Sequence, residues 1–473
     1  MRQVDIGEEI TLEFYNMKKS LLVSMSMAII LLVSSCISGN PGKGKPSGNA
    51  SSGQAQETEA TKSNADAQAG DAEQSAQQEV NMTPVGKHPK IQVFLETSGS
   101  MNGYVNGGTS VFQQVVKEYL SGINNANYAS EVSYNYITSK VTPQANDLNS
   151  YITKLTPKNF AANGNVSTTD IGGIFKQVLS MTDPNTVSIL ITDGIISPGK
   201  GVDTRAYLTG QTTDVRDAIV NYINQYGDLA CLVYQLDSRF KGNYFDFENT
   251  KHPIDQQRPF YIWVFGHTLS VAMLKLQYVP DRDFKVTPIR NQWMIFNTDL
   301  SIFQDQFQYG VILPNTTSIG KYTRVDKTTL RGIQKPDPTD NYRFSFGANI
   351  SVATYLMGED YVCDTRNYVH LVNRLSKQEF FGKIETDYNG NSPYSNIFRV
   401  ESEQPFSKGT FSLAFVPQVP DWAHQCTDYD DRSFDGNNDD KTYGLEAIFN
   451  GIFNGYNNAN HDNIIAQFDF EIR

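Results

Sequence analysis

The fold of this chain is decided by residues 90–101, Lys90-Ile91-Gln92-Val93-Phe94-Leu95-Glu96-Thr97-Ser98-Gly99-Ser100-Met101. The run from Ile91 to Leu95 is apolar, which is typical of a strand buried on both faces of a parallel sheet. It ends on the carboxylate of Glu96 and turns through the hydroxyls of Ser98 and Ser100. Open α/β sheets bind ligands at the carboxyl ends of their strands. Because hard cations such as Mg2+ prefer oxygen donors, this stretch predicts an oxygen-rich binding loop.

Two later stretches have the same character. The apolar run 187–191 predicts a second buried strand, which leads to the carboxylate of Asp193. Thr169 precedes apolar residues at helical spacing, which predict an amphipathic helix from Ile171 to Leu179. The three stretches thus place carboxylates and hydroxyls after two predicted strands and a hydroxyl before one predicted helix.

Together these stretches resemble the von Willebrand factor type A (VWA) family. Its metal-ion-dependent adhesion site (MIDAS) uses an Asp-x-Ser-x-Ser motif, a Thr from a second loop and an Asp from a third. The resemblance implies a site for Mg2+ or Mn2+, and by position its ligands would be Glu96, Ser98, Ser100, Thr169 and Asp193.

Glu96 stands where the family has Asp, so a longer side chain enters the implied site. Mg2+ requires a near-octahedral arrangement of ligands, and the extra methylene of Glu relative to Asp would alter that geometry. Two alternatives therefore stay open. Either the site binds the cation with Glu96 as a neighbouring or water-bridged group, or Glu96 makes internal hydrogen bonds and the fold is a metal-free scaffold.

Alternating strand and helix patterns extend over residues 88–280 and predict an α/β domain. The expected fold is a doubly wound, mostly parallel, VWA-like (Rossmann-like) sheet. Further strands are predicted at 132–137, 229–236 and 260–265. The intervening segment 237–259 is expected to be a surface insertion or a loop that covers the carboxyl ends of the strands.

Residues 281–473 have a different pattern. Runs with period two, such as 344–352, 411–415 and 464–472, predict half-buried strands. Separated by Gly, Pro and Asn, they favour a mainly antiparallel β domain, a sandwich or open barrel, interrupted by one helix near 445–452.

An acidic stretch in this second half is a weak calcium-loop candidate. Asp431, Ser433, Asp435 and Asp439 occupy positions 1, 3, 5 and 9 of such a loop. Position 12 is Thr442 instead of the bidentate Glu that the loop needs. A solvated acidic loop is the main interpretation, and a weak Ca2+ site is the alternative.

The N-terminus predicts export and anchoring. Lys18-Lys19 and the apolar run 21–33 are typical of a signal peptide over residues 1–35, whose real start we expect at Met17. The sequence before Cys36 resembles a bacterial lipobox, which implies cleavage there and acylation of the Cys36 thiol. Residues 36–87 comprise the lipidated Cys36 and a segment without aromatic side chains, which we expect to be a flexible tether. Because no aspartate follows Cys36, we expect the lipid-anchored protein to be located at the outer membrane.

Charge and composition exclude several classes of protein. The chain of 473 residues has a formal net charge of -12, which disfavours nucleic-acid binding. None of its six histidines lies in a recognisable catalytic context, so we expect no enzyme activity. Three cysteines follow Cys36, without zinc-site spacing.

Two functions follow from the sequence. The first is a membrane-anchored lipoprotein whose VWA domain mediates protein binding or adhesion at the bacterial cell envelope, with an acidic side chain of the partner completing the metal site. The second is a glycan- or peptidoglycan-binding protein, or a hydrolase, that acts through the C-terminal β domain.

Overall fold

The computed structural model describes residues 89–144, 147–162, 169–303, 307–373, 376–387, 392–433, 439–460 and 462–473. These residues belong to one compact unit. The predicted signal peptide, Cys36 and the tether lie outside the described residues. Within the described ranges, no helix is both long and apolar enough to cross a bilayer.

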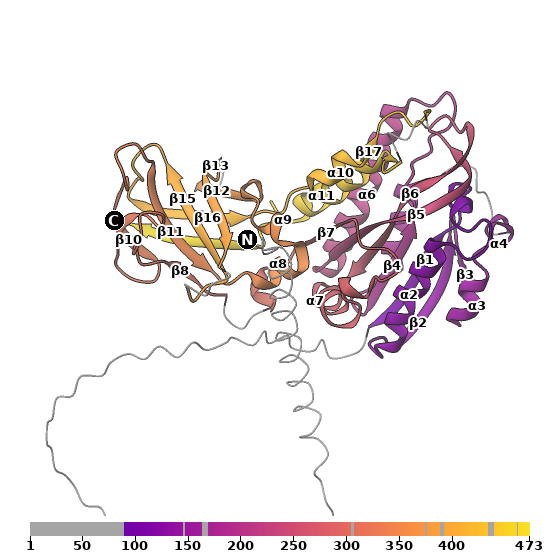
Figure 1. The fold of residues 1–473 in the computed structure, drawn as a ribbon, viewed down its shortest axis with the longest axis horizontal. Coiled ribbons are helices and arrows are strands. Elements are labelled where there is room, and N and C mark those ends of the chain that lie inside the picture. Colours follow the sequence, from indigo (N-terminus) through magenta and orange to yellow (C-terminus); the bar gives the residue numbers. More distant parts are fainter. Residues whose placement is uncertain are drawn as a thin grey trace, which may run out of the picture. The chain divides into compact units, whose positions relative to one another are not determined.

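A seven-stranded mixed sheet forms the α/β part (Figure 1). Parallel pairing is confined to β2, β1 and β4, whereas the other neighbours in the sheet pair antiparallel. The α/β class is therefore confirmed, but the mostly parallel, doubly wound arrangement holds only for that half of the sheet. In spatial order the strands are β3 (Val141–Pro143), β2 (Glu131–Ile137), β1 (Lys90–Glu96), β4 (Thr186–Thr192), β6 (Lys251–Gly266), β5 (Ala230–Phe245) and β7 (Asn291–Phe296).

Helices cover both faces of this sheet (Figure 1). The core on one face joins α5 (Ile171–Ser180), α6 (Thr204–Tyr226) and α11 (Leu445–Asn460) to sheet residues such as Phe94 and Trp263. The opposite face is covered by α2 (Val111–Asn125) and α7 (Thr268–Met273). Both parallel strands β1 and β4 are almost fully buried, as their continuous apolar runs predict.

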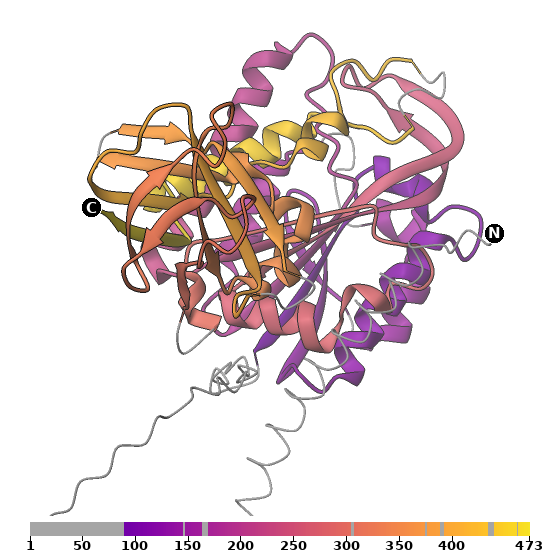
Figure 2. The same cartoon turned by 60° about the vertical axis from the view of Figure 1, so that its left-hand side comes forward.

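The strands β5 and β6 continue beyond the sheet as one long antiparallel ribbon (Figure 2). The segment 237–259, expected as an insertion or covering loop, forms most of this ribbon. Its pairing holds up to Phe245 opposite Lys251. On one side of it the alternating residues Phe240 and Tyr244 are buried, which is why the segment pairs as strands instead of looping through solvent.

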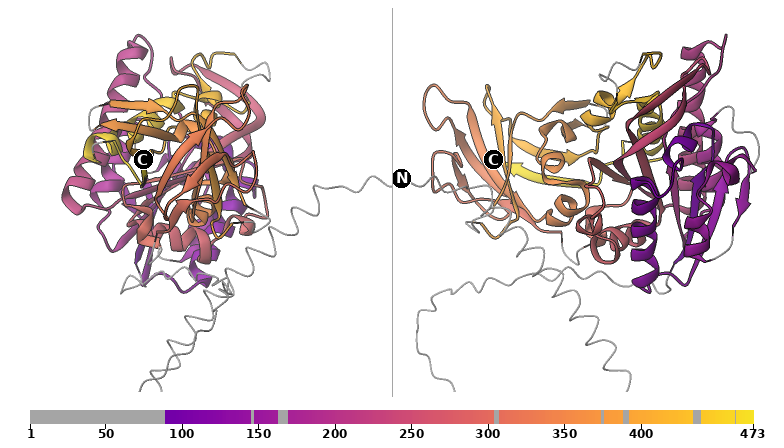
Figure 3. Two further views of the ribbon diagram at one scale, coloured as in Figure 1. Left: turned by 90° about the vertical axis from the view of Figure 1, so that its left-hand side faces the viewer. Right: turned by 45° about the vertical axis from the view of Figure 1, so that its right-hand side comes forward.

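Two further sheets form a sandwich (Figure 3). Aromatic rings of the two sheets pack against each other. The ring centroids of Phe346 and Phe470 are 4.6 Å apart, and those of Phe344 and Phe411 are 5.4 Å apart. All pairs are antiparallel except β10 with β19. One sheet contains β13 (Ser376–Glu379), β12 (Tyr368–Asn373), β16 (Gly409–Phe415), β19 (Ala466–Ile472), β10 (Thr329–Gln334) and β9 (Lys321–Arg324), and the other contains β14 (Gly382–Thr386), β15 (Asn396–Ser402), β11 (Tyr342–Ala348) and β8 (Tyr309–Val311).

The second half of the chain contains more helix than expected. The period-two pattern predicted a strand through Val352, but β11 ends at Ala348 and Val352 is buried in a helix. The expectation of one helix is therefore wrong, since α8 (Ser351–Met357), α9 (Glu359–Val362) and α10 (Asp421–Gln425) accompany α11. The remaining elements are α3 (Leu148–Thr153), α4 (Pro157–Ala161), β17 (Thr427–Asp428), β18 (Thr442–Tyr443), η1 (Ser100–Tyr104), η2 (Leu274–Tyr278), η3 (Asp281–Asp283), η4 (Leu300–Phe303) and η5 (Thr365–Asn367).

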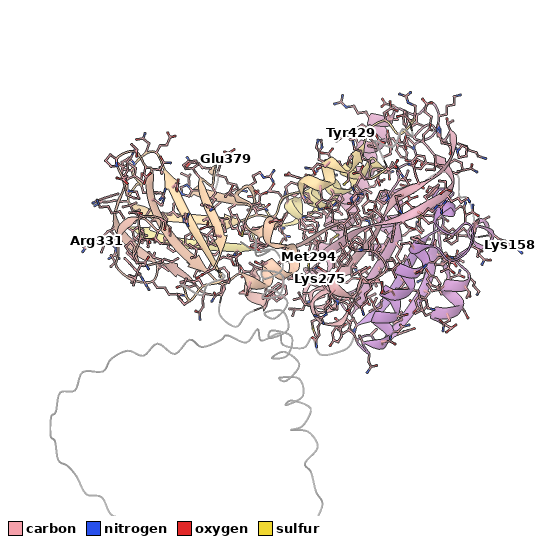
Figure 4. All side chains as sticks on the ribbon, in the orientation of Figure 1. Lys158, Lys275, Met294, Arg331, Glu379 and Tyr429 are labelled. Carbon is pink, nitrogen blue, oxygen red and sulfur yellow. The ribbon has the colours of Figure 1, made fainter. Side chains whose placement is uncertain are left out.

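Packing crosses the expected boundary between residues 280 and 281. Beyond it, β7 is the edge strand of the seven-stranded sheet, and α11 packs against α6. Lys275, labelled in Figure 4, is buried in the π-helical turn η2 and links this strand to the preceding chain. Its ammonium donates hydrogen bonds to Asp281, at 2.7 Å, and to Gln292 of β7, at 2.5 Å.

Candidate functional site

The five residues matched to the metal site come together at one edge of the seven-stranded sheet. Glu96 is the last residue of β1, and Ser98 and Ser100 lie in the turn that leads into η1. Thr169 precedes α5, and Asp193 follows β4. The edge collects them because β1 and β4 are parallel neighbours, so their carboxyl ends lie side by side.

Glu96 is fully buried and both of its carboxylate oxygens accept hydrogen bonds. The Thr169 hydroxyl donates to Oε1 at 3.3 Å, and the Thr192 hydroxyl donates to Oε2. Beside them the Ser98 and Ser100 hydroxyls are 2.8 Å apart and hydrogen-bonded to each other. Four of the five predicted residues thus contact one another in pairs through oxygen atoms.

Asp193 is also fully buried, but its two oxygens differ. Oδ1 accepts a hydrogen bond from the Ile195 amide at 3.1 Å. Oδ2 has no hydrogen-bond partner among the described residues. A buried oxygen without a partner costs free energy, on the order of 1–3 kcal/mol, so this atom is suited to accept a proton, a donor or a cation.

Burial of the two carboxylates raises their pKa values. Desolvation and the neighbouring charge of Asp193 raise the pKa of Glu96 to about 8, against hydrogen bonds that lower it. Desolvation raises the pKa of Asp193 to about 6, although the Ser100 hydroxyl, the Ile195 amide and the charge of Arg258 lower it. Near neutral pH the pair therefore holds a proton that a divalent cation would displace.

A small cleft gives access to part of this cluster. Its volume is 170 Å³, and the predicted residues that line it are Glu96, Ser98 and Thr169. Asp170 lies at the rim, where it caps α5 by accepting a hydrogen bond from the Gly173 amide at 3.0 Å. Asp193 does not line the cleft, so a group that enters meets Glu96 first.

A loop covering this edge was one of the two alternatives expected for segment 237–259, but the sequence did not predict that the cover is a paired ribbon or that it buries Arg258. The ribbon of β5 and β6 lies against η1, where the Tyr104 hydroxyl donates to the Pro259 carbonyl at 2.6 Å. Arg258 is buried with it, donates to the Lys441 carbonyl at 2.8 Å and lies over the Tyr244 ring at 4.8 Å. No local pattern could have singled out Arg258, because its position depends on the ribbon pairing.

The structure describes three of the four calcium-loop candidates, Asp431, Ser433 and Asp439. Asp431 is buried and already accepts hydrogen bonds from the Tyr244 hydroxyl at 2.6 Å and the Phe247 amide at 3.0 Å. Ser433 is exposed, and Asp435 lies outside the described residues. Asp439 has one buried oxygen without a hydrogen-bond partner in the described part of the chain. Thr442 belongs to the short strand β18 and not to a following helix.

The donor set of the first site fits a hard cation, since two carboxylates and three hydroxyls converge and one buried oxygen of Asp193 accepts no hydrogen bond from the described residues. Clusters of three or more His, Cys, Asp or Glu placed to hold a metal are absent from the described residues. A site built largely from hydroxyls is a different kind of cluster. No family model, curated protein or solved structure matches this chain.

Proposed function

We propose that this chain is an interaction protein of the VWA type that binds a divalent cation, Mg2+ or Mn2+, at the end of β1. Glu96, Ser98, Ser100, Thr169 and Asp193 would hold the cation. The observation that carries the proposal is the gathering of four oxygen-bearing side chains near Asp193, whose Oδ2 has no hydrogen-bond partner in the described residues. When bound, the cation supplies a coordination position for an acidic side chain of a protein partner.

The charge of this site supports capture of an acidic side chain from a partner. Two carboxylates and three neutral hydroxyls leave a divalent cation electron-poor, which favours capture of a further carboxylate. Asp170, which is exposed and lines the cleft, repels an acidic side chain as long as no cation is bound. Partner binding would therefore depend on the metal.

The anchoring of this protein is part of the proposal. Acylation of Cys36 would hold it on the outer membrane of a bacterium, with the tether separating the folded part from the bilayer. More than one acyl chain is needed for stable attachment, which the lipobox resemblance implies.

Calorimetric titration of Mg2+ and Mn2+ into the EDTA-treated chain tests the metal site. We expect saturable binding in the wild type, its loss in Asp193→Ala and its retention in Asp217→Ala. Asp217 is a matched control because its side chain is 46% exposed and pairs with its neighbour Arg216. Equal affinity in the wild type and Asp193→Ala would refute the assignment.

A metal-free scaffold is the second candidate, and a specific observation favours it. Both oxygens of Glu96 are already satisfied by Thr169 and Thr192, and the charge of Arg258 acts on Asp193. An absence of Mg2+ and Mn2+ binding in the wild type, with binding restored by Glu96→Asp, would select this candidate over the first.

A further inference from the structure

The largest cavity that we describe lies away from the metal-site candidate. Its volume is 640 Å³, within the range of about 300–1,000 Å³ that is typical of small-ligand sites. One side consists of α9 and η5, and the other of α10 with the chain that precedes it. Gln292 of β7 also lines it.

Arg366 ties the two sides together. Its guanidinium donates to both oxygens of Asp421 on α10, at 2.8 Å each. It also donates to Asp364 beside η5, at 2.9 and 3.0 Å. Fork-like pairs of this kind fix geometry, so the spacing of the walls is set before any ligand enters.

Two aromatic side chains line the cavity with their polar atoms already engaged. The Trp422 indole N–H donates to the Gln292 carbonyl at 3.3 Å, and the ring packs against Phe449. The Tyr361 hydroxyl donates to the Gln418 carbonyl at 2.5 Å. What these residues offer a ligand is therefore ring carbon, a flat apolar surface.

The remaining lining is rich in amides and acids. Four amide side chains line the cavity, together with four carboxylates and only one guanidinium; the amides are Gln292, Asn367, Gln418 and Gln425. Amides both donate and accept hydrogen bonds, as hydroxyl groups require. The excess of carboxylates disfavours an anionic ligand.

We propose that this cavity binds a neutral or N-acetylated saccharide, with the C–H face of a sugar ring against Trp422 and its hydroxyls on the exposed side chains of Gln425 and Asp360. A basic peptide is the competing ligand, but Arg366 already neutralises Asp364 and Asp421, two of the four acids. The proposal is independent of the metal site and of the protein partner.

Titration of the full-length chain with N-acetylchitotetraose and with cellotetraose tests the proposal. We expect saturable binding of at least one probe and a loss of about tenfold in affinity in Trp422→Ala, which corresponds to about 1.4 kcal/mol for removal of a stacking ring. Phe381→Ala removes an aromatic side chain that is 54% exposed and lies outside the cavity, so this control should bind as the wild type does.

A second variant covers the case in which Trp422→Ala fails to fold. Asp360 and Gln425 are both exposed, so the double variant Asp360→Ala/Gln425→Ala should fold normally and lose affinity several-fold. Binding of neither saccharide, equal binding by folded variants and wild type, or binding of tetralysine in place of both saccharides would each overturn the proposal.

Discussion

Two buried carboxylates at one edge of the sheet make Glu96 and Asp193 the most consequential residues of the chain. In the absence of a cation, the folded state holds protons on them that the unfolded chain releases. Burial raises the pKa of Glu96 from 4.5 to about 8 and that of Asp193 from 3.8 to about 6. Their contribution to stability is therefore greatest below the unfolded pKa values and is lost as the pH rises through the folded ones.

This loss of stability with rising pH gives a prediction for single residues. In EDTA, the melting temperature of the wild type should fall by about 5 °C more than that of Glu96→Gln between pH 5.5 and 8.5, because Gln cannot ionise. Thermal melting followed by circular dichroism measures the difference. Saturating Mg2+ should reduce it, since the metal binds the deprotonated form. Parallel pH profiles for the two proteins would contradict the raised pKa of Glu96.

At the scale of elements, the ribbon of β5 and β6 determines what covers the candidate site. Its fit against η1 is close: a methyl group on Gly103 would lie 2.3 Å from ring atoms of Phe240. Gly242 of the ribbon also lies close to the Gly103 backbone, since a Cβ added there would lie 3.0 Å from the Gly103 Cα. The absence of side chains at these two glycines lets the ribbon lie on the loop after β1.

Gly103→Ala should therefore destabilise the chain by about 2–3 kcal/mol through overpacking, as measured by urea unfolding. Gly210→Ala is the control, because Gly210 is exposed in α6 and nothing lies within 4 Å of an added methyl. That control should be neutral or stabilising by up to about 1 kcal/mol. Phe240→Ala should rescue part of the Gly103→Ala loss, and strict additivity of the two changes would argue against the contact.

At the scale of the whole molecule, the proposed attachment to a membrane would depend on one side chain, Cys36. The described residues contain the other three cysteines, and Cys231 and Cys426 are buried while Cys363 is partly exposed. If the lipobox resemblance holds, Cys36→Ser should abolish incorporation of an alkyne-labelled palmitate in a Gram-negative host and release the protein from the membrane fraction. Cys363→Ser is the matched control and should keep the label. Palmitate labelling of Cys36→Ser would exclude Cys36 as the acylated residue.

Contacts between the two halves of the chain cross the domain boundary that we expected near residue 280. Helix α11, near the C-terminus, packs so closely on α6 that a methyl group on Gly451 would lie 2.7 Å from Val215. A methyl group on Gly455 would lie 2.6 Å from Ile219. Residues of the second half thus complete the core of the α/β part, which is why a change of pattern near residue 280 did not mark a boundary in the packing.

By itself, the sequence determined the local elements around the candidate site. The apolar runs of β1 and β4 and the helical stripe of α5 are short-range patterns, and the structure has strands and a helix there. Asp170 caps α5 through an amide only three residues away, so that start was also readable from sequence. The convergence of Glu96 and Asp193 followed from the rule that parallel strands share a carboxyl edge, whereas Thr169 was joined to them only by the resemblance to the VWA family.

Only the tertiary structure decided what surrounds that site. The antiparallel return of β6 beside β4, the ribbon over η1, Arg258 near Asp193 and α11 on α6 all join residues far apart in the chain. Local periodicity shows which face of an element is apolar, but it contains no information on the partner that buries this face. The partner is selected by complementary packing of the whole chain, such as the fit of Gly103 to Phe240.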